Sequence, residues 1–409
     1  MKKKIKMQAR LLNQSFQSDL KKLMRSLKVE EAGIKIMFPK AKLRILQINK
    51  IPSFSANILK QELLSLGGDL ALPREALIKK TLINSVLLAT DSQIKKLLKK
   101  IAYQGSYLKN IGFLVQQTLK NFNKGKFILK TATKTLRIKR PLIMGIINLT
   151  PDSFSGDGLL KNSASQFLER VKRKTEQMLK EGADLIDIGG ESTRPGAKPI
   201  KAEEEIRRVI PALKVIKKNF PKIPVSVDTY KPLVAKLALK EGADIINDIT
   251  GLRNPEITKI VAKKKAGVII MHMKGKPSTM QKNPFYKDVV EEVYNFLAQA
   301  TQKALDQGIE KDRIVIDVGI GFGKRVRDNL ELIKYLYQFK SLGYPILIGV
   351  SRKSFIGKIL RKENPQERIL GTLVSLVVSI INGAKILRVH DVACAKEIVK
   401  MTQVIFSLC

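Results

Sequence analysis

Between residue 142 and the end of the chain, eight short apolar runs alternate with longer amphipathic stretches. Continuous apolar runs of this length are typical of strands that are buried on both faces. The intervening stretches, such as 164–181 and 289–307, place apolar residues at helical spacing. The eight predicted strands are residues 142–147, 184–189, 224–227, 244–247, 267–271, 313–318, 345–350 and 384–389.

Eight strand-then-helix units over about 270 residues have the size and the order of a parallel (β/α)8 TIM barrel. A doubly wound open sheet is the alternative, but such a sheet seldom needs eight evenly built units. We therefore predict an α/β protein in which a TIM barrel is preceded by a small α/β domain. The barrel makes a further demand, because the catalytic side chains of TIM barrels gather at the carboxyl ends of the strands.

Polar side chains lie at or near the carboxyl ends of the predicted strands, where a barrel active site requires them. They are Asn148, Asp187, Asp228, Asn247, His272, Asp317, Lys353, Arg388 and His390, and they include both histidines of the chain. A structural role is an equal explanation for any single member, and for His272, Asp187 and Glu191 it means packing or orienting a neighbour. Their coincidence at successive strand ends nevertheless predicts an active site.

The sequence predicts three segments. Residues 1–125 form a small basic α/β domain, residues 126–141 form a linker and hairpin, and residues 142–409 form the catalytic barrel. The alternation of apolar residues before position 139 indicates the hairpin. No constellation of His, Cys or carboxylate residues in the first segment points to a role for it.

Within the first segment, the pattern predicts strands at 43–48 and 83–89 and a helix at 55–66. Asp91-Ser92 is expected to cap a further helix, because short polar side chains satisfy free backbone N–H groups at helix starts.

The net charge of +40 is the most unusual property of the composition. Residues 1–140 hold 31 Lys and Arg against 7 Asp and Glu, a net charge of +24, so the first third is the most basic part. A nucleic-acid-binding protein with an inactive barrel would account for this charge. We favour lysine-coated helix faces, because the chain has no Trp and only 6% aromatic residues for base stacking.

Three features predict a cytoplasmic protein without a membrane partner. No apolar segment reaches the roughly 18 residues of a membrane span. The opening MKKKIKMQAR has no apolar export segment behind its basic residues. The two cysteines, Cys394 and Cys409, have no metal-ligand spacing and are too few for a disulfide framework, so we expect reduced thiols.

Eight stretches at successive strand ends carry a family resemblance. They are MGIINLTPDSFSGDG, GADLIDIGGESTRPGA, VSVDTYKP, INDITG, MHMKG, DVGIGFGK, GVSRKSFIG and RVHDV. Residues 142–392 thus closely resemble dihydropteroate synthase. The resemblance implies a transferase of folate biosynthesis that condenses 6-hydroxymethyl-7,8-dihydropterin diphosphate with para-aminobenzoate, uses Mg2+ and is a sulfonamide target. It also implies a homodimer packed through barrel helices.

The chemistry of pterin binding fits the residue types at the strand ends. A pterin presents an amide-like edge and an amino group, which buried carboxylates and amides can pair with bidentately. Asp228, Asn247 and Asp317 suit this role. The resemblance adds Lys353 and Arg388 as further pterin contacts.

The leaving diphosphate needs partners of its own. As its bond to the pterin methylene breaks, negative charge develops on the diphosphate, which cationic donors and a metal ion stabilise. The resemblance assigns this role to Asn148, Arg388 and His390, and assigns the Mg2+ contact to Asn148. The expected catalytic residues are therefore Asn148, Asp228, Lys353, Arg388 and His390.

The aniline nitrogen of para-aminobenzoate is already nucleophilic near neutral pH, so the reaction requires no strong general base. By resemblance, the para-aminobenzoate site and its loops comprise Thr193, Arg194, Pro195, Phe154, Phe322 and Ser354.

Two departures from the family pattern affect these expectations. Asp317-Val318-Gly319 stands where the family has Asp-Pro-Gly, which keeps the carboxylate. Gly156 precedes Asp157, so Asp152 and Asp157 both remain open as the loop carboxylate near the metal. The enzyme alternative is a pterin-binding methyltransferase of the same barrel family, which is not expected to carry both STRPG and SRKS.

Overall fold

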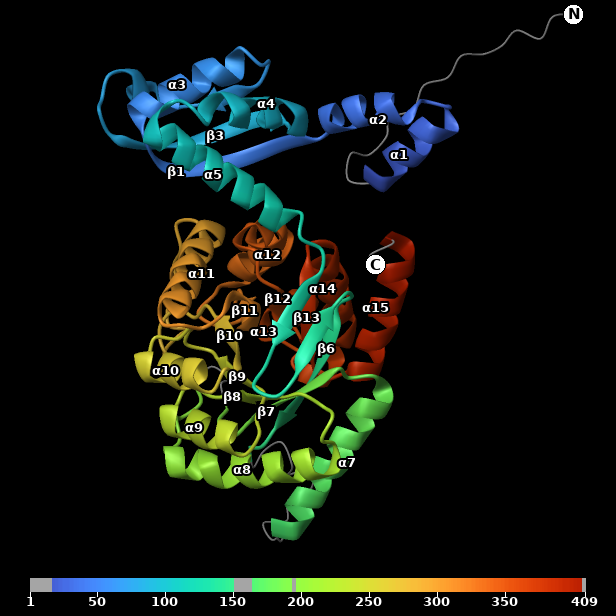
Figure 1. Cartoon of the computed structure of the whole chain (residues 1–409). Helices are drawn as coiled ribbons and strands as arrows, with labels where there is room; N and C mark the ends of the chain where they lie inside the picture. The colour runs from blue at the N-terminus through green and yellow to red at the C-terminus, as the bar shows by residue number, and fades with distance from the viewer. Residues whose placement is uncertain (1–16, 151–163, 193–195, 407–409) are drawn as a thin grey trace, which may run out of the picture. The chain divides into compact units, whose positions relative to one another are not determined.

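The computed structural model describes residues 17–150, 164–192 and 196–406 (Figure 1). The chain divides into two compact units, Met1–Leu119 and Lys120–Cys409. The division falls within helix α5 (Gly105–Phe122). The domain boundary predicted near residue 125 stays a prediction.

The first unit contains an antiparallel sheet in the order β1-β3-β2, with helices on one face. Its strands are β1 (Leu43–Pro52), β2 (Asp69–Ala71) and β3 (Leu82–Thr90). Its α-helices are α1 (Gln17–Ser26), α2 (Glu31–Met37), α3 (Ser53–Leu64), α4 (Asp91–Ile101) and α5, and its 3-10 helices are η1 (Phe38–Ala41) and η2 (Arg74–Leu77). Alternate residues of the strands, such as Leu87, pack against Leu59 and Leu97 of the helices. The predicted small α/β domain is confirmed.

Helix α4 begins with a different cap from the one that the sequence predicted. The Thr90 hydroxyl accepts a hydrogen bond from the Gln93 backbone at 3.3 Å, and the Gln93 side chain accepts one from the Thr90 backbone at 2.7 Å. This reciprocal pair is a capping box. Asp91 instead forms an ion pair with Arg44 at 2.7 Å, so the prediction of an Asp91-Ser92 cap was wrong.

The first two strands of the second unit, β4 (Phe127–Lys130) and β5 (Thr135–Ile138), form an antiparallel hairpin. Leu129 and Ile138 are fully buried, and they belong to one apolar cluster with residues from the first half of the barrel strands, including Met144. At the turn, the Ala132 backbone donates to the carbonyl of Asp244 at 3.1 Å. The hairpin therefore closes the amino-terminal end of the barrel.

In the described residues, eight parallel strands close into a barrel in which each strand lies beside the next one in the chain. They are β6 (Leu142–Asn148), β7 (Leu185–Gly189), β8 (Val225–Asp228), β9 (Ile245–Asp248), β10 (Gly267–Met271), β11 (Ile314–Asp317), β12 (Ile346–Ile348) and β13 (Ala384–Val389). Each one lies in a predicted apolar run or extends it by one residue. The predicted (β/α)8 barrel is confirmed, and the open-sheet alternative was wrong.

Helices surround the barrel (Figure 1). They are α7 (Ala164–Glu181), α8 (Ala202–Asn219), α9 (Pro232–Lys240), α10 (Pro255–Lys263), α11 (Val289–Asp306), α12 (Val326–Lys334), α13 (Ser354–Leu360), α14 (Ile369–Ile381) and α15 (Val392–Phe406). Between them lie the 3-10 helices η3 (Lys311–Arg313), η4 (Leu336–Leu342) and η5 (Pro365–Arg368). Strands and helices share a continuous apolar core.

Close packing in this core requires a glycine in β6. A Cβ atom added to Gly145 would lie 2.7 Å from the sulfur of Met178 on α7. None of the helices that the structure describes is long and apolar enough to cross a membrane.

Candidate active site

The carboxyl ends of the barrel strands bring predicted site residues to one end of the barrel. Asn148, Asp228 and Asp317 are the last residues of their strands, and Asn247 and Arg388 are the last but one. Asn148 lies opposite Gly189, which lies opposite Asp228 on the following strand. Residues far apart in the sequence thus form a single polar surface because parallel strands end at the same rim.

Arg388 lies at the centre of this surface. Its Nε donates to Oδ2 of Asp187 at 2.7 Å, and its Nη2 donates to Oδ2 of Asp228 at 2.9 Å. Asn247 also reaches Oδ2 of Asp187, at 3.4 Å. Asp187, left without a role by the sequence analysis, therefore holds Arg388 in place. The signal was a carboxylate inside an otherwise apolar, buried strand, two residues before the end of β7.

Several buried polar atoms of this cluster have no hydrogen-bond partner among the described residues. They are Oδ1 of Asp187, Oδ1 of Asp228, Oδ1 of Asn247 and the hydroxyl of Ser226. Leaving such atoms unpaired costs roughly 1–3 kcal/mol each. Three of the four are acceptors only, so the cluster suits a ligand that presents several N–H donors.

Burial raises the pKa of Asp228 to about 7. The charge of Arg388 opposes this rise, and the charges of Asp187 and Glu205 add smaller contributions to it. Burial also raises the pKa of Asp317. The cluster therefore gathers carboxyl groups in a poorly solvated place, where a bound donor would favour their charged form.

Lys353 lies just before helix α13, opposite the loop that follows β11. Its ammonium lies 4.2 Å from the ring centroid of Phe322. Burial, followed by the positive charge of Arg388, lowers the pKa of Lys353 to about 8. Gly321 leaves room for it, because an added Cβ would lie 3.2 Å from Cδ of Lys353. Lys353 and Phe322 are thus brought together, as the predicted site requires.

The turn after β11 keeps the carboxylate of Asp317 in place without the family's proline. Oδ1 of Asp317 accepts a hydrogen bond from the backbone of Gly319 at 2.7 Å. Gly319 has a positive φ of 67°, and a Cβ there would lie 1.9 Å from the carbonyl oxygen of His272. The glycine, rather than the residue before it, is what this turn requires.

His390 lies beyond β13 and contacts Ser351. Nδ1 of the ring is 2.9 Å from the serine hydroxyl, which also accepts from the His390 backbone at 3.2 Å. Burial and the nearby Arg388 lower the pKa of His390 to about 3. The neutral ring therefore offers a hydrogen-bond donor, not a charge, to a ligand.

His272 has a supporting position in the wall of the barrel. Nζ of Lys324 lies 2.9 Å from its Nδ1, and its ring meets Phe296 edge to face at 4.9 Å. Burial lowers the pKa of His272 to about 2 and that of Lys324 to about 7. Lys324 also donates to the carbonyl of Phe322 at 3.1 Å, so this pair fixes the loop under Lys353.

A buried network around Glu191 joins the loops after β7 and β8. Glu191 accepts hydrogen bonds from Tyr230 at 2.7 Å, from Lys231 at 2.5 Å and from the backbone of Ile200 at 3.0 Å. Lys231 also pairs with Glu205 at 2.5 Å. Lys231 and Glu205 could not be named from the sequence, since neither stands at a strand end.

The remaining predicted residues are not all placed. Phe154, Thr193, Arg194 and Pro195, together with Asp152 and Asp157, lie outside the described residues. Ser354 is exposed at the start of α13. In the described part of the chain, no ion pair or hydrogen bond joins Asn148 or Ser354 to the Arg388 cluster.

Comparison with known proteins gives this site a class. The sequence pattern of the family described as pterin binding enzyme matches residues 144–390, more than half of the chain. The barrel with its acceptor-lined end is therefore that of a pterin-binding enzyme.

Relatives narrow this class. The dihydropteroate synthase of Haemophilus influenzae is 44% identical over 270 residues, which are 66% of this chain and 96% of the relative. That of Escherichia coli K12 is 42% identical over 271 residues, or 66% and 93% of the two chains. The structure resembles the Xanthomonas albilineans dihydropteroate synthase with 4-aminobenzoic acid, at 41% identity, a TM-score of 0.64 and coverage of 68% and 98%. The chain belongs to the dihydropteroate synthase family.

Proposed function

We propose that this chain is a transferase that condenses 6-hydroxymethyl-7,8-dihydropterin diphosphate with para-aminobenzoate to give 7,8-dihydropteroate and diphosphate. The observation that carries the proposal is the Arg388 cluster, in which one guanidinium bridges two buried carboxylates beside unpaired acceptors. The Burkholderia cenocepacia relative, 40% identical with a TM-score of 0.62 over 69% of this chain and 97% of its own, has been solved with 7,8-dihydropteroate. The comparisons support neither a methyltransferase nor a nucleic-acid-binding protein.

The acceptors would bind the pterin edge. Asp228 presents a carboxylate to the adjacent amino and ring N–H groups, and Asn247 adds an amide oxygen. Asp317 serves the other end of the ring. Lys353 donates to a ring acceptor, while the guanidinium of Arg388 is held by Asp187 and Asp228 close to the reacting methylene. Preorganisation by these ion pairs keeps the cost of orienting the cation low when the bond breaks.

The leaving diphosphate would be received by Asn148, Arg388 and the neutral His390, which donates a hydrogen bond. The amide oxygen of Asn148 suits Mg2+, which commonly takes one or two protein ligands beside phosphates and water. The described residues contain no group of three or more His, Cys, Asp or Glu that could hold a metal alone. Further oxygens would come from the diphosphate and from Asp152 or Asp157, which lie outside the described residues. When bound, Mg2+ would neutralise charge on the leaving group.

Para-aminobenzoate would lie between Phe322 and the start of α13, with its carboxylate near Ser354. The loop residues Phe154, Thr193, Arg194 and Pro195 complete this part of the proposal. Two solved relatives support it, since one holds 4-aminobenzoic acid and the Yersinia pestis enzyme holds a sulfonamide drug. We expect a sulfonamide to compete with para-aminobenzoate for this chain.

The test is an assay of diphosphate release from the purified chain with the pterin diphosphate, para-aminobenzoate and Mg2+. Release should require para-aminobenzoate and should fall about 1,000-fold in Arg388→Gln, because the variant leaves two buried carboxylates without their cation. Lys385→Gln, in the same strand but away from the cluster, is the control. Release that is independent of para-aminobenzoate would contradict the proposal.

The proposal includes a homodimer formed through α14 and α15. These neighbouring helices expose large apolar side chains, Leu370, Val374, Val378, Ile381, Met401, Val404 and Ile405. Large apolar side chains exposed on neighbouring helices are typical of an interface. Val374→Glu should give monomers in analytical ultracentrifugation, with Lys358→Glu as the control. A native chain that sediments as a monomer at micromolar concentration would refute the dimer. The cytoplasmic location stays a prediction.

A further inference from the structure

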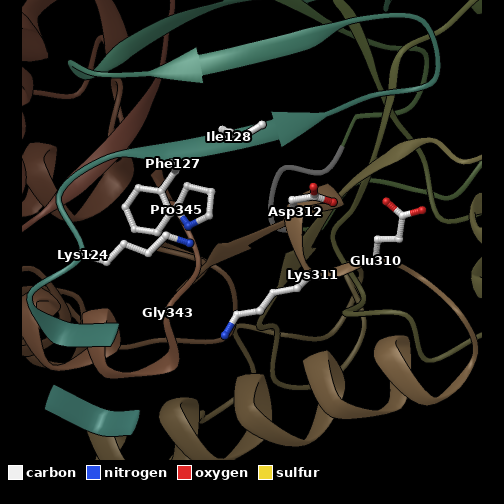
Figure 2. Close-up of a pocket in the computed structure, with 8 residues that line it drawn as sticks. All are labelled: Lys124, Phe127, Ile128, Glu310, Lys311, Asp312, Gly343 and Pro345. Atoms are coloured by element: carbon white, nitrogen blue, oxygen red, sulfur yellow. The ribbon is translucent and has the colours of Figure 1, made fainter. Parts of the chain in front are cut away.

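A cavity of about 400 Å3 lies at the end of the barrel opposite the candidate active site (Figure 2). Asp312 lies two residues before β11 and Pro345 lies one residue before β12, whereas the active-site residues lie at the carboxyl ends of the strands. The full wall consists of Lys124, Phe127, Ile128, Glu310, Lys311, Asp312, Gly343 and Pro345.

The acidic residues of this wall already have cationic partners. Lys130 pairs with Asp312 at 2.7 Å and with Glu310 at 3.5 Å, and Arg313 also lies 3.5 Å from Glu310. These two cations balance the two carboxylates. Lys124 and Lys311 belong to no ion pair among the described residues, so the cavity carries an uncompensated charge of +2.

The two uncompensated ammonium groups share one space. Figure 2 shows the side chains of Lys124 and Lys311 reaching into it from different walls, with the carboxylates of Glu310 and Asp312 turned away from both nitrogens. Each ammonium lies near an aromatic ring, Lys124 at 4.7 Å from the centroid of Phe127 and Lys311 at 5.3 Å from that of Tyr344. The rings keep both cations at the cavity wall.

Like-charge repulsion is the consequence of this arrangement. The pKa of Lys311 is lowered, first by burial and then by the positive charges of Lys124 and Lys120. An anion placed between the ammonium groups would remove this repulsion, and Lys is a common point-charge partner of phosphate.

The rest of the wall fits an organic body attached to the anion. Phe127, Ile128 and Pro345 provide apolar surface.

We propose that this cavity is a binding site for a small phosphate-bearing anion, held between the ammonium groups of Lys124 and Lys311. Two cations on separate walls suit a phosphoryl group, which offers several oxygens in different directions. The site lies at the closed end of the barrel and does not depend on the reaction proposed at the other end.

Isothermal titration calorimetry of the full chain at low salt tests the site with two probes, inorganic diphosphate and adenosine monophosphate. The variant Lys124→Gln/Lys311→Gln should weaken binding of at least one probe about tenfold or more at low salt, because both ammonium groups that face the cavity are lost. Lys126→Gln, an exposed lysine next to the cavity in the sequence, is the matched control. Diphosphate is titrated into Arg388→Gln as well, so that binding at the proposed catalytic site is recognised separately.

The two probes distinguish a free phosphate group from a phosphorylated organic molecule. A loss confined to the double lysine variant supports the site for whichever probe shows it. Equal affinities in the double variant, the control and the native chain, or no binding of either probe outside the Arg388 site, overturn the proposal. The double variant should also melt no lower than the native chain without anion, since it removes a repulsion, which excludes misfolding as the cause of lost binding.

Discussion

At the scale of single residues, the ionised carboxylate of Asp228 lowers the stability of the fold but is the form that a ligand with N–H donors binds. Burial raises its pKa to about 7 although Arg388 donates to it at 2.9 Å. A carboxyl group whose pKa rises on folding stabilises the fold fully below its unfolded pKa of about 4, and this contribution is lost as the pH rises towards 7. A ligand that donates two hydrogen bonds to the carboxylate would reverse the shift.

Asp228→Asn should therefore separate the effect of this carboxyl group on the stability of the fold from its effect on pterin binding. Turnover should fall about 100-fold or more, because an amide cannot accept both pterin donors. The melting temperature of the variant relative to the native chain should rise from pH 4 to pH 8, because the variant lacks the ionisation cost. Pterin affinity of the native chain should likewise improve up to about pH 7 and then level off. Calorimetric melts and pterin titrations across this range measure both effects, and a pH-independent difference in melting temperature would contradict the assignment.

Glu191 is a single residue that positions the loop after β8. It ties Tyr230, Lys231 and the backbone of Ile200 together, so it holds the loop after β8 against the stretch that follows β7. Glu191→Gln keeps the shape but leaves Lys231 with Glu205 as its carboxylate partner. We expect KM for para-aminobenzoate to rise about tenfold with a smaller change in kcat, because a loosened loop weakens binding more than chemistry.

Glu203→Gln, an exposed change in the first turn of α8, is the matched control for Glu191→Gln. A loss of kcat without a change in KM would show that Glu191 acts on the reacting groups and not on loop position. Equal losses of melting temperature and activity in steady-state assays would indicate a purely structural role.

At the scale of elements, the sequence predicted the positions of the buried barrel strands. The strands β6 to β13 could be located because most of their residues are apolar and buried, with few polar interruptions such as Asp187 in β7 and Arg388 in β13. Their shared rim followed from parallel order, which is why Asp228, Asn247, Asp317 and Arg388 could be named in advance. The ion pairs could not, because a strand-end position does not say that Arg388 would point at Asp187.

The contacts that loop residues make could not be predicted from the sequence either. Lys231 and Lys324 look like ordinary surface lysines in the chain, and only their burial against Glu191 and His272 distinguishes them. The cap of α4 was missed for a local reason, since both Thr90 and Asp91 are good capping residues and the Gln93 reciprocal bond decides between them.

The turn after β11 should tolerate no side chain at Gly319. Gly319→Ala should destabilise the chain by about 3 kcal/mol or more, since it adds a clash with the carbonyl of His272 to the strain of a positive φ. Gly308→Ala is the control, because Gly308 has a φ of 88° with no atom within 4 Å of an added Cβ, and should cost only about 1 kcal/mol. Denaturant unfolding measures both. Equal costs would mean that the turn moves freely, and then Asp317 would not be fixed by it.

At the scale of the whole molecule, the two units have separate apolar cores. One core is formed by residues such as Leu59, Leu87 and Leu97, and the other lies in and around the barrel. A unit with its own core can fold alone. The barrel unit also includes the end of helix α5, because Asn121 donates to the carbonyl of Ser341 at 3.0 Å and the ring of Phe122 lies 4.4 Å from the ammonium of Lys340.

Two truncations therefore test both the boundary and the role of the first unit. Deletion of residues 1–119 should leave turnover within about threefold of the native chain, since the site residues belong to the barrel. Deletion of residues 1–125 removes Asn121 and Phe122 as well, and should lower the melting temperature by a further 2–4 °C or so, the effect of about 1 kcal/mol in a domain of this size.

Steady-state assays and thermal melts of the two truncated chains decide between the boundaries. Equal melting temperatures would place the functional boundary near residue 125, as the sequence predicted, because the end of α5 would then contribute nothing to the barrel. A folded barrel without residues 1–119 that has lost turnover would show instead that the first unit takes part in catalysis. That result would give the basic domain a role which neither its composition nor its own fold reveals, since its charge lies on lysines that serve equally well as solvated helix faces.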